Sequence, residues 1–385
     1  MLDVATLIGN SQMFPVLEHW AFFNHAGVAP LPRIAADQIK RFANQAQSQG
    51  YLNSAWYSDI EILRKLCAKL INAHSGEVAF VKNTSEGIAI VANGIEWQWG
   101  DGIVTTAVEY PANIYPWMEI VRSRGAKLEL VPEIAMPDGS HCVPTSAILE
   151  AASKPQTKVV TLSAVEYASG QQHELAKIGA FCRERGILFC VDAIQAIGVL
   201  PFDVKAMNID FASADSHKWM LGPEGAGMFY CRRELIERTR PLMVGWMNVI
   251  NAHDYGKYDY TLKADAGRFE CGTYNVAGLM GMLGSLTLID QVGVDVIWPR
   301  VQTLLDRFVA GATRKGYSVI SPQGEAMRSG IVSIKAHGHS HELIVKKCRE
   351  SHIEIAKREG RLRVSPHFYN TDEQIDRLVE ILPSH

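Results

Sequence analysis

The stretch Asp210 to Gly227 reads D-F-A-S-A-D-S-H-K-W-M-L-G-P-E-G-A-G. It begins in an apolar segment, continues through a loop with three glycines, and leads into a second apolar run at 228–231. The pattern predicts a strand, a loop and a strand, with Lys218 at the turn. Bulky apolar neighbours desolvate an amine and lower its pKa, which makes Lys218 a candidate nucleophile. Taken alone, the window favours a lysine whose stem packs at a strand end.

An acidic residue upstream changes this interpretation. The segment Gly186 to Gly198 reads G-I-L-F-C-V-D-A-I-Q-A-I-G, and its apolar run 187–191 ends at Asp192. Such a run predicts a buried parallel strand with an acid at its carboxyl end, where open α/β sheets bind ligands. An acid for a pyridine nitrogen and a lysine that forms a Schiff base are the pairing that pyridoxal 5'-phosphate (PLP) requires. Asp192 and Lys218 therefore predict PLP as the cofactor.

The two segments resemble the class V aminotransferase family of fold type I PLP enzymes. That family includes cysteine desulfurases, C–S lyases, isopenicillin N epimerase and kynureninase. The resemblance runs from about Phe23 to the C-terminus and implies an α/β fold, with a mostly parallel sheet in the large domain and a smaller α+β C-terminal domain. We expect an N-terminal arm at 1–22 that packs with the small domain, a large PLP-binding domain at 23–265 and a small domain at 266–385.

The whole-chain composition is that of an ordinary soluble protein. The chain has 385 residues, 47% of them hydrophobic, and a formal net charge of −3. Its basic residues are scattered, so neither nucleic acid nor an anionic membrane is expected as a partner. The N-terminus lacks the pattern of a signal peptide. Seven cysteines without a C-x-x-C motif fit reduced thiols, and we expect a cytoplasmic protein.

Further motifs resemble cofactor contacts of the family. In K-N-T-S-E-G, Thr84 or Ser85 is a candidate N-cap of a helix whose first turn forms an anion site. A plain capping-box fragment is the alternative, and the resemblance implies that this turn binds the PLP phosphate. His217 resembles a second phosphate ligand. Gln195 resembles the hydrogen-bond donor to the phenolic oxygen of the cofactor.

Three positions depart from the family pattern. Tyr110 stands where desulfurases have a histidine that stacks on the PLP ring and moves protons; tyrosine keeps the stacking and loses the base. Tyr167 stands where desulfurases have an asparagine near the phenolic oxygen, so this contact stays open. Asp215 stands where the family has a small residue beside the phosphate. Because two anions repel, we expect Asp215 to turn away or to pair with a cation.

Residues from a second subunit are also implied. The motif R-F-E-C-G-T-Y-N at 268–275 resembles one in which a glycine and a threonine reach the phosphate bound by the other subunit. Gly272 and Thr273 are therefore candidate cofactor ligands. A homodimer with active sites at its interface is expected.

Substrate-side residues rest on the resemblance as well. Arg363 resembles the arginine that binds the α-carboxylate of an amino acid, a role suited to a guanidinium. Arg361 is the nearest competitor, because strand alternation puts it on the same face. His25 and Asn113 are also expected near the substrate, although a structural role for His25 is an equal alternative.

Together, these motifs predict a PLP enzyme that acts on an amino acid. Desulfurases use a mobile cysteine shortly before the carboxylate-binding arginine, whereas 351–362 contains no cysteine and Cys348 lies in a segment of helical pattern. We therefore expect an aminotransferase activity on a small amino acid. A C–S lyase, a cysteine desulfurase-like enzyme and an epimerase are the alternatives, and a non-catalytic PLP-binding protein is the least favoured. No metal is expected, since H-G-H-S-H at 337–341 fits a polar loop.

Overall fold

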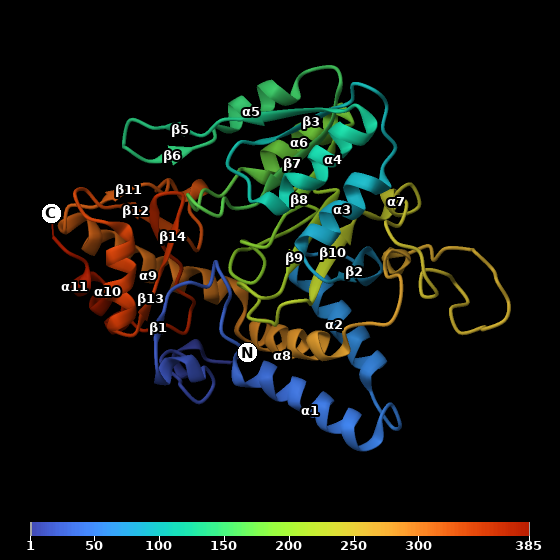
Figure 1. Cartoon of the computed structure of the whole chain (residues 1–385), viewed down its shortest axis with the longest axis horizontal. Coiled ribbons are helices and arrows are strands. Elements are labelled where there is room, and N and C mark those ends of the chain that lie inside the picture. Colours follow the sequence, from blue (N-terminus) through green and yellow to red (C-terminus); the bar gives the residue numbers. More distant parts are fainter. Residues whose placement is uncertain (1, 385) are drawn as a thin grey trace.

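A seven-stranded sheet forms the centre of the larger part of the molecule (Figure 1) in the computed structural model, which describes residues 2–384. The strand order is β2-β10-β9-β8-β7-β3-β4, and only β10 runs antiparallel to its neighbours. The strands are β2 (Val78–Val81), β3 (Gly102–Thr106), β4 (Lys127–Val131), β7 (Thr157–Ser163), β8 (Leu188–Asp192), β9 (Phe211–Asp215) and β10 (Gly227–Cys231). All of them except β4 are almost wholly buried, as their apolar runs predict.

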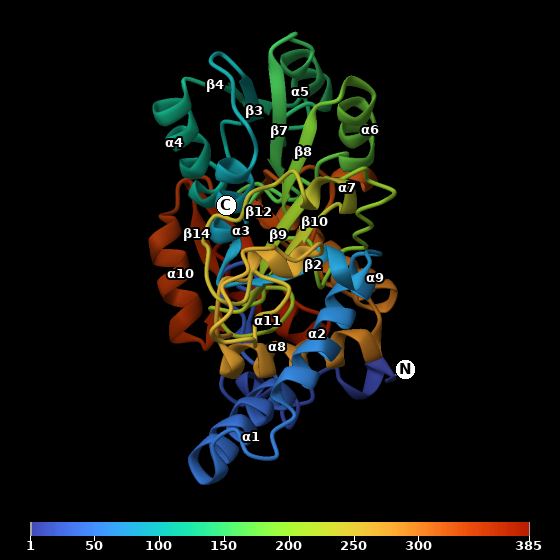
Figure 2. The same ribbon diagram turned by 90° about the vertical axis from the view of Figure 1, so that its right-hand side faces the viewer.

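Helices cover both faces of this sheet, and Figure 2 shows α4 and α6 on opposite sides. The helices of this part are α1 (Arg33–Gln49), α2 (Trp56–Leu70), α3 (Thr84–Gly94), α4 (Tyr115–Arg124), α5 (Thr145–Ala152), α6 (Leu175–Arg185) and α7 (Arg233–Ile236). Two hydrophobic clusters result, one containing the buried residues of α5 and α6 and the other those of α3 and α4. The α/β class expected from the sequence is confirmed.

The C-terminal part is α+β. It contains a four-stranded antiparallel sheet of order β11-β12-β15-β14. Its elements are β11 (Ser318–Val319), β12 (Val332–Lys335), α10 (His341–Glu350), β14 (Ala356–Arg358), β15 (Arg361–Val364) and α11 (Asp372–Ile381), and α9 (Val294–Arg314) packs against α11. The preceding α8 (Val276–Val292) packs against α1 and α2 of the large part. The division into domains therefore stays a prediction.

Two short strand pairs connect the parts. The strand β1 (Ala21–Phe22) pairs in parallel with β13 (Ile353–Glu354), so the N-terminal segment adds a strand to the C-terminal part. The hairpin of β5 (Ile134–Ala135) and β6 (His141–Cys142) extends from the large part toward β11 and β12 (Figure 1). Short 3-10 helices complete the chain: η1 (Val4–Thr6), η2 (Pro15–Glu18), η3 (Ser75–Glu77), η4 (Pro111–Asn113), η5 (Ala266–Phe269) and η6 (Glu325–Met327).

No single helix within residues 2–384 is long and apolar enough to cross a membrane. The pair α8 and α9 reaches the required length and composition only together, and it is bent by 84° at the break.

Candidate functional site

A pocket of about 690 Å³ lies where the sequence predicts it, at the carboxyl ends of β8 and β9. The first turn of α3 and the strands β14 and β15 supply other walls. Eight of the residues that the sequence analysis assigned to the cofactor or the substrate line this pocket. They are Thr84, Ser85, Tyr110, Asp192, Gln195, His217, Lys218 and Arg363. The fold thus gathers side chains that lie as far apart in sequence as Thr84 and Arg363.

Lys218 and Asp192 form the chemical centre of the pocket. Lys218 stays partly exposed through the pocket mouth, but protein surrounds its amine, and this burial lowers the pKa of Lys218 to about 8 against the opposing attraction of Asp192. Burial raises the pKa of Asp192 to about 6, although a hydrogen bond from the backbone N–H of Ile194 at 3.0 Å favours its charged form. At neutral pH the pair therefore combines a carboxylate with an amine that is readily deprotonated.

A strained turn follows the lysine. Leu221 has a φ of 56°, in the left-handed region that branched side chains rarely adopt, and its N–H donates to the Lys218 carbonyl at 3.0 Å. His367 holds the same turn, because its Nε2 lies 3.1 Å from the Trp219 carbonyl. The backbone on the C-terminal side of the amine is thereby fixed.

The first turn of α3 faces the pocket. Its N-cap is Asn83, whose side chain accepts a hydrogen bond from a first-turn amide at 3.0 Å, which corrects the expectation that Thr84 or Ser85 caps the helix. Thr84 instead occupies the first helical position, and its Oγ1 accepts from the backbone N–H of Asp215 at 3.0 Å. Thr84 and Ser85 both line the pocket, and free first-turn amides of a helix favour an anion, so the phosphate role of this turn stays a prediction.

Gly87 allows this helix to approach the sheet. A Cβ at Gly87 would lie 2.2 Å from the Oγ of Ser213 in β9. Any larger residue would push the first turn of α3 away from the carboxyl end of β9.

The carboxylate of Asp215 lies next to His217 and the backbone of Ser216. Its Oδ2 lies 3.0 Å from Nδ1 of His217, and Oδ1 accepts from the backbone N–H of Ser216 at 2.8 Å. The expectation that Asp215 turns away or pairs with a cation stays a prediction, because Nδ1 of His217 lies within ion-pair distance but has no hydrogen-bond partner within the described chain.

Gln195 ties the N-terminal segment to the lysine turn. Its Nε2 donates to the Ala26 carbonyl at 3.0 Å, and its Oε1 accepts from Nε1 of Trp219 at 2.8 Å. An amide nitrogen has two donor protons, so one remains for a ligand.

Two tyrosines stand over the lysine. The Lys218 Nζ lies 5.5 Å from the ring centroid of Tyr110, which packs edge-on against Tyr167 at 5.3 Å between centroids. The hydroxyl of Tyr167 donates to Glu359 at 3.2 Å. Tyr167 therefore lines the pocket without the amide group that the family uses there.

Arg363 is prepared to bind an anion. Its Nη1 donates to the Tyr167 carbonyl at 2.8 Å and its Nη2 to Oδ1 of Asn24 at 3.1 Å, while its buried Nε has no partner within the described chain. Burial and the charge of Arg358 lower the pKa of Arg363 to about 9. A desolvated guanidinium with an unused N–H gains strongly from a carboxylate.

The competitor Arg361 is occupied elsewhere. Its Nη1 and Nη2 donate to the two carboxylate oxygens of Glu133 at 3.2 and 2.5 Å. Glu133 immediately precedes the β5–β6 hairpin, and its Oε2 also lies 3.2 Å from Nδ1 of His141. This ion pair assigns Arg361 to the contact between the two parts of the molecule and leaves Arg363 to the pocket.

Two of the expected substrate-side residues lie behind the pocket wall. His25 is fully buried, with Nδ1 2.9 Å from the Ser365 carbonyl and Nε2 2.6 Å from the Tyr369 hydroxyl. Asn113 is also fully buried, and its Oδ1 accepts from Thr161 and from a tryptophan of α4 at 2.7 and 3.0 Å. Neither side chain lines the pocket, so His25 follows the structural alternative and the substrate-side expectation for Asn113 is corrected, although Nδ2 of Asn113 has no hydrogen-bond partner within the described chain.

Asn24 and Arg358 line the pocket without having been anticipated. In an extended segment every second side chain points to the same side, and this alternation could have identified Asn24. Phe22, Asn24 and Ala26 line the pocket, while the side chains between them are buried. Arg358 lies at the end of the short strand β14, where the sequence offers no comparable pattern.

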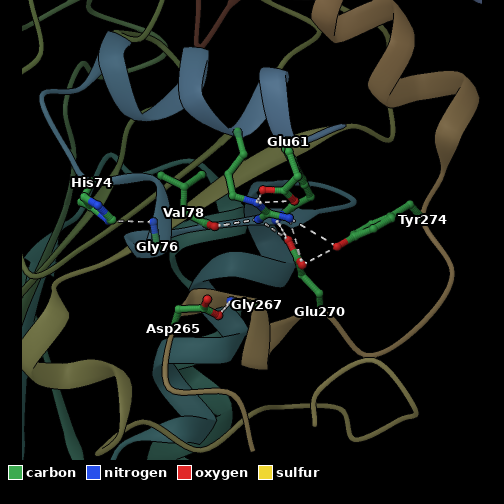
Figure 3. Close-up of polar contacts among 10 residues, drawn as sticks. Glu61, His74, Gly76, Val78, Asp265, Gly267, Glu270 and Tyr274 are labelled. Carbon is green, nitrogen blue, oxygen red and sulfur yellow. Dashed lines mark hydrogen bonds and ion pairs between the residues drawn. The ribbon is translucent and has the colours of Figure 1, made fainter. Parts of the chain in front are cut away.

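Gly272 and Thr273 do not line the pocket of their own chain. An ion pair fixes the segment that carries them (Figure 3): Glu270 accepts from Nη1 and Nη2 of Arg64 at 2.7 and 3.2 Å and from Tyr274 at 2.6 Å. Glu270 also accepts from the N–H of Phe80 in β2 at 2.8 Å. The segment is thus attached to the large sheet on both sides of the glycine and the threonine.

The described residues contain no group of three or more histidine, cysteine, aspartate or glutamate side chains that could hold a metal ion.

Comparisons with known proteins agree with this geometry. A family model described as aminotransferase class-V matches residues 21–378. The chain is 28% identical, over 389 residues, to a probable cysteine desulfurase of Pyrococcus abyssi (strain GE5 / Orsay), covering 96% of this chain and 94% of that protein. A solved complex of the cystine C-S lyase C-DES with its product cysteine persulfide is 26% identical, with a TM-score of 0.86 and coverage of 95% and 98%. A C-DES mutant with glycine covalently linked to the PLP cofactor has a TM-score of 0.88 at 24% identity, covering 96% and 98%, and supports the fold.

Proposed function

The chain belongs to the aminotransferase class-V family, and we propose that this PLP-dependent enzyme cleaves a carbon–sulfur bond in cysteine or cystine without the help of an enzyme cysteine. One observation carries the proposal. The pocket combines the amine of Lys218, the acid of Asp192 and the guanidinium of Arg363, and no cysteine lines it within the described chain.

The residues present fit PLP. Lys218 offers a partly neutral amine, and Asp192 is a buried acid at a strand end. The first turn of α3, with Thr84 and Ser85, offers donors for a phosphate. When bound, PLP withdraws electrons from the α-carbon of an amino acid.

The side chains have separable roles. Arg363 would bind the α-carboxylate and orient the amino acid, since its guanidinium is desolvated. Lys218 would hold the cofactor through its Nζ and could accept the α-proton there as a general base. Asp192, when ionised, would favour a proton on the ring nitrogen of the cofactor. Tyr110 lines the pocket with its ring 5.5 Å from the Lys218 Nζ and would pack against an aromatic ring bound there.

Cysteine positions support elimination over persulfide formation on the enzyme. Cys348, the last cysteine in the sequence, is fully buried in α10. Cleavage of cystine then balances as cystine plus water giving pyruvate, ammonia and cysteine persulfide. Transamination, which the sequence analysis favours, stays the alternative, because the same Lys218 and Asp192 serve both reactions.

The test is a half-reaction. Purified holoenzyme is mixed with cysteine, cystine or alanine, without an oxo acid, and the products and the cofactor form are measured. Repeated turnover of cystine to pyruvate and persulfide supports the proposal, and stoichiometric conversion of PLP to pyridoxamine phosphate contradicts it. Lys218→Ala should abolish turnover, whereas Cys348→Ser and Cys271→Ser should retain it. Loss of sulfur release in either cysteine variant would show that an enzyme thiol is required.

We further propose a homodimer in which Gly272 and Thr273 reach the pocket of the partner subunit. The long segment between α7 and η5, which extends from the body of the molecule in Figure 1, supports this proposal. It exposes Tyr255, Tyr258 and Tyr260, and Tyr258 is completely exposed. Exposed aromatic clusters of this kind mark interaction surfaces.

Subunit complementation tests the dimer. Lys218→Ala and Thr273→Ala chains should each be weakly active or inactive alone, and mixed dimers should regain one intact site. Recovery after mixing supports shared sites, and a monomer by light scattering contradicts them. We also propose a cytoplasmic location, which the seven unpaired cysteines support.

A further inference from the structure

Two Glu-Tyr dipeptides flank the pocket. Glu109-Tyr110 follows β3, and Glu166-Tyr167 follows β7. In each dipeptide the glutamate is buried and the tyrosine lines the pocket. The two tyrosines, which we call the tyrosine wall, pack edge-on against each other, with Lys218 beneath Tyr110.

Glu109 clamps the end of β7. Its Oε1 lies 2.5 Å from the N–H of Ser163, and its Oε2 lies 2.5 Å from the Ser163 hydroxyl. Ser163 stands directly opposite Asp192 in the β7–β8 ladder, so the clamp lies beside the acid that serves the cofactor. Both hydrogen-bond partners are neutral. Burial, and after it the charge of Glu166, raises the pKa of Glu109 well above its ordinary value.

Glu166 has a different environment. Its Oε1 accepts from the hydroxyl of Thr106 at 2.9 Å and lies 3.0 Å from Nε2 of His173, and both partners are almost fully buried. These contacts anchor the Glu166 side chain between the end of β3 and the segment that leads from β7 to α6.

The tyrosine wall connects the two ends of a bound amino acid. Tyr110 covers the amine of Lys218, and the main-chain carbonyl of Tyr167 accepts from Arg363 at 2.8 Å. A displacement of the first dipeptide would move Tyr110 away from Lys218. A displacement of the second would move the Tyr167 carbonyl that accepts from Arg363. The buried glutamates are the side chains that anchor these dipeptides.

We propose that Glu109 and Glu166 are positioning residues for the tyrosine wall: Glu109 acts through its clamp on Ser163, and Glu166 acts through its contacts with Thr106 and His173. This inference rests on the proposed function, because bound PLP reports the position of the wall.

The contacts predict which substitutions are tolerated. Glutamine at position 109 can accept from the Ser163 N–H and donate to the Ser163 hydroxyl, so Glu109→Gln keeps the clamp. Alanine at position 166 loses the contacts with Thr106 and His173, so Glu166→Ala should disturb the wall.

The experiment measures visible absorption and circular dichroism of PLP bound to the holoenzyme, as a function of pH. Glu109→Gln should match the wild type. Glu109→Ala should reproduce Tyr110→Ala, with loss of the induced dichroism and a shift of the absorption midpoint by about half a pH unit to lower pH, because a cation loses the face of an aromatic ring. Glu166→Ala should also lose dichroism, and an unchanged Glu166→Ala spectrum would overturn the positioning role of Glu166.

Each result decides the inference. A Glu109→Ala spectrum equal to that of the wild type overturns it, and so does a Glu109→Gln spectrum equal to that of Glu109→Ala. If Glu109→Ala does not fold, Ser163→Ala replaces it, and an unchanged spectrum there counts against the clamp. Absence of PLP from the wild type would instead refute the proposed function, so the two failures are distinguishable.

Discussion

The reactivity of Lys218 gives a quantitative prediction. With a pKa of about 8 against a reference value of 10.5, roughly one amine in ten is neutral at pH 7 instead of about one in three thousand, a gain of about 300-fold. The acylation rate of Lys218 in the protein without PLP should therefore rise with pH and level off above about 8. Burial is the main cause of the lowered pKa of Lys218, and the charges of nearby side chains adjust its value further.

Two variants should move this profile in opposite directions. The Asp192 carboxylate favours the ammonium form, so Asp192→Asn should shift the midpoint to lower pH. The Arg363 guanidinium disfavours the ammonium form, so Arg363→Met should shift it to higher pH. Each change should amount to roughly one pH unit, as expected for single charges at a buried amine.

Competitive labelling measures these midpoints. A short pulse of acetic anhydride at each pH is followed by mass spectrometry of the peptides. Labelling of Lys218 is compared with that of Lys40, whose side chain is 71% exposed and serves as the reference in the same sample. A wild-type midpoint near 10, or shifts of the same sign in both variants, would refute the electrostatic reasoning.

Two stability predictions follow from the same structure. Glu270→Ala removes the buried carboxylate partner of the Arg64 guanidinium and should cost about 3–5 kcal/mol of unfolding free energy, whereas Glu61→Ala, which removes the exposed partner of the same arginine, should cost less than about 1 kcal/mol. Denaturant unfolding compares the two, and equal losses would contradict the assignment of the buried pair. Gly87→Ala should lower stability by about 1–3 kcal/mol through overlap with a serine of β9, and Gly324→Ala, whose added methyl meets only one side-chain atom at 4.0 Å, should be nearly neutral. Thermal unfolding of both glycine variants measures this difference, and a neutral Gly87→Ala would show that the helix can shift.

Much of the large part could be predicted because its signals are local. Buried parallel strands are continuous apolar runs, and the residue that ends such a run necessarily lies at the carboxyl edge of the sheet. Asp192 was found in this way and Lys218 by its apolar neighbours and its pairing with that acid, and the structure places both in one pocket. Arg363 was found by resemblance alone.

The errors concern which face a side chain occupies. In the segment 22–26, alternation separates Asn24 from His25, but sequence alone does not say which set faces the ligand. The structure points Asn24 toward Arg363 and commits His25 to Tyr369. The choice between Arg361 and Arg363 was equally undecidable, because Glu133, which is 228 positions away from Arg361, determines it.

The pairing of β1 with β13 joins the two sides of the pocket. Through this pairing and the Asn24–Ser365 bridge, the N-terminal segment is attached to the C-terminal part that carries Arg363. The same segment accepts a hydrogen bond from Gln195 at the Ala26 carbonyl, on the side of the pocket that holds Lys218 and Asp192. A displacement of residues 21–26 should therefore alter the carboxylate-binding side and the amine side of the pocket together.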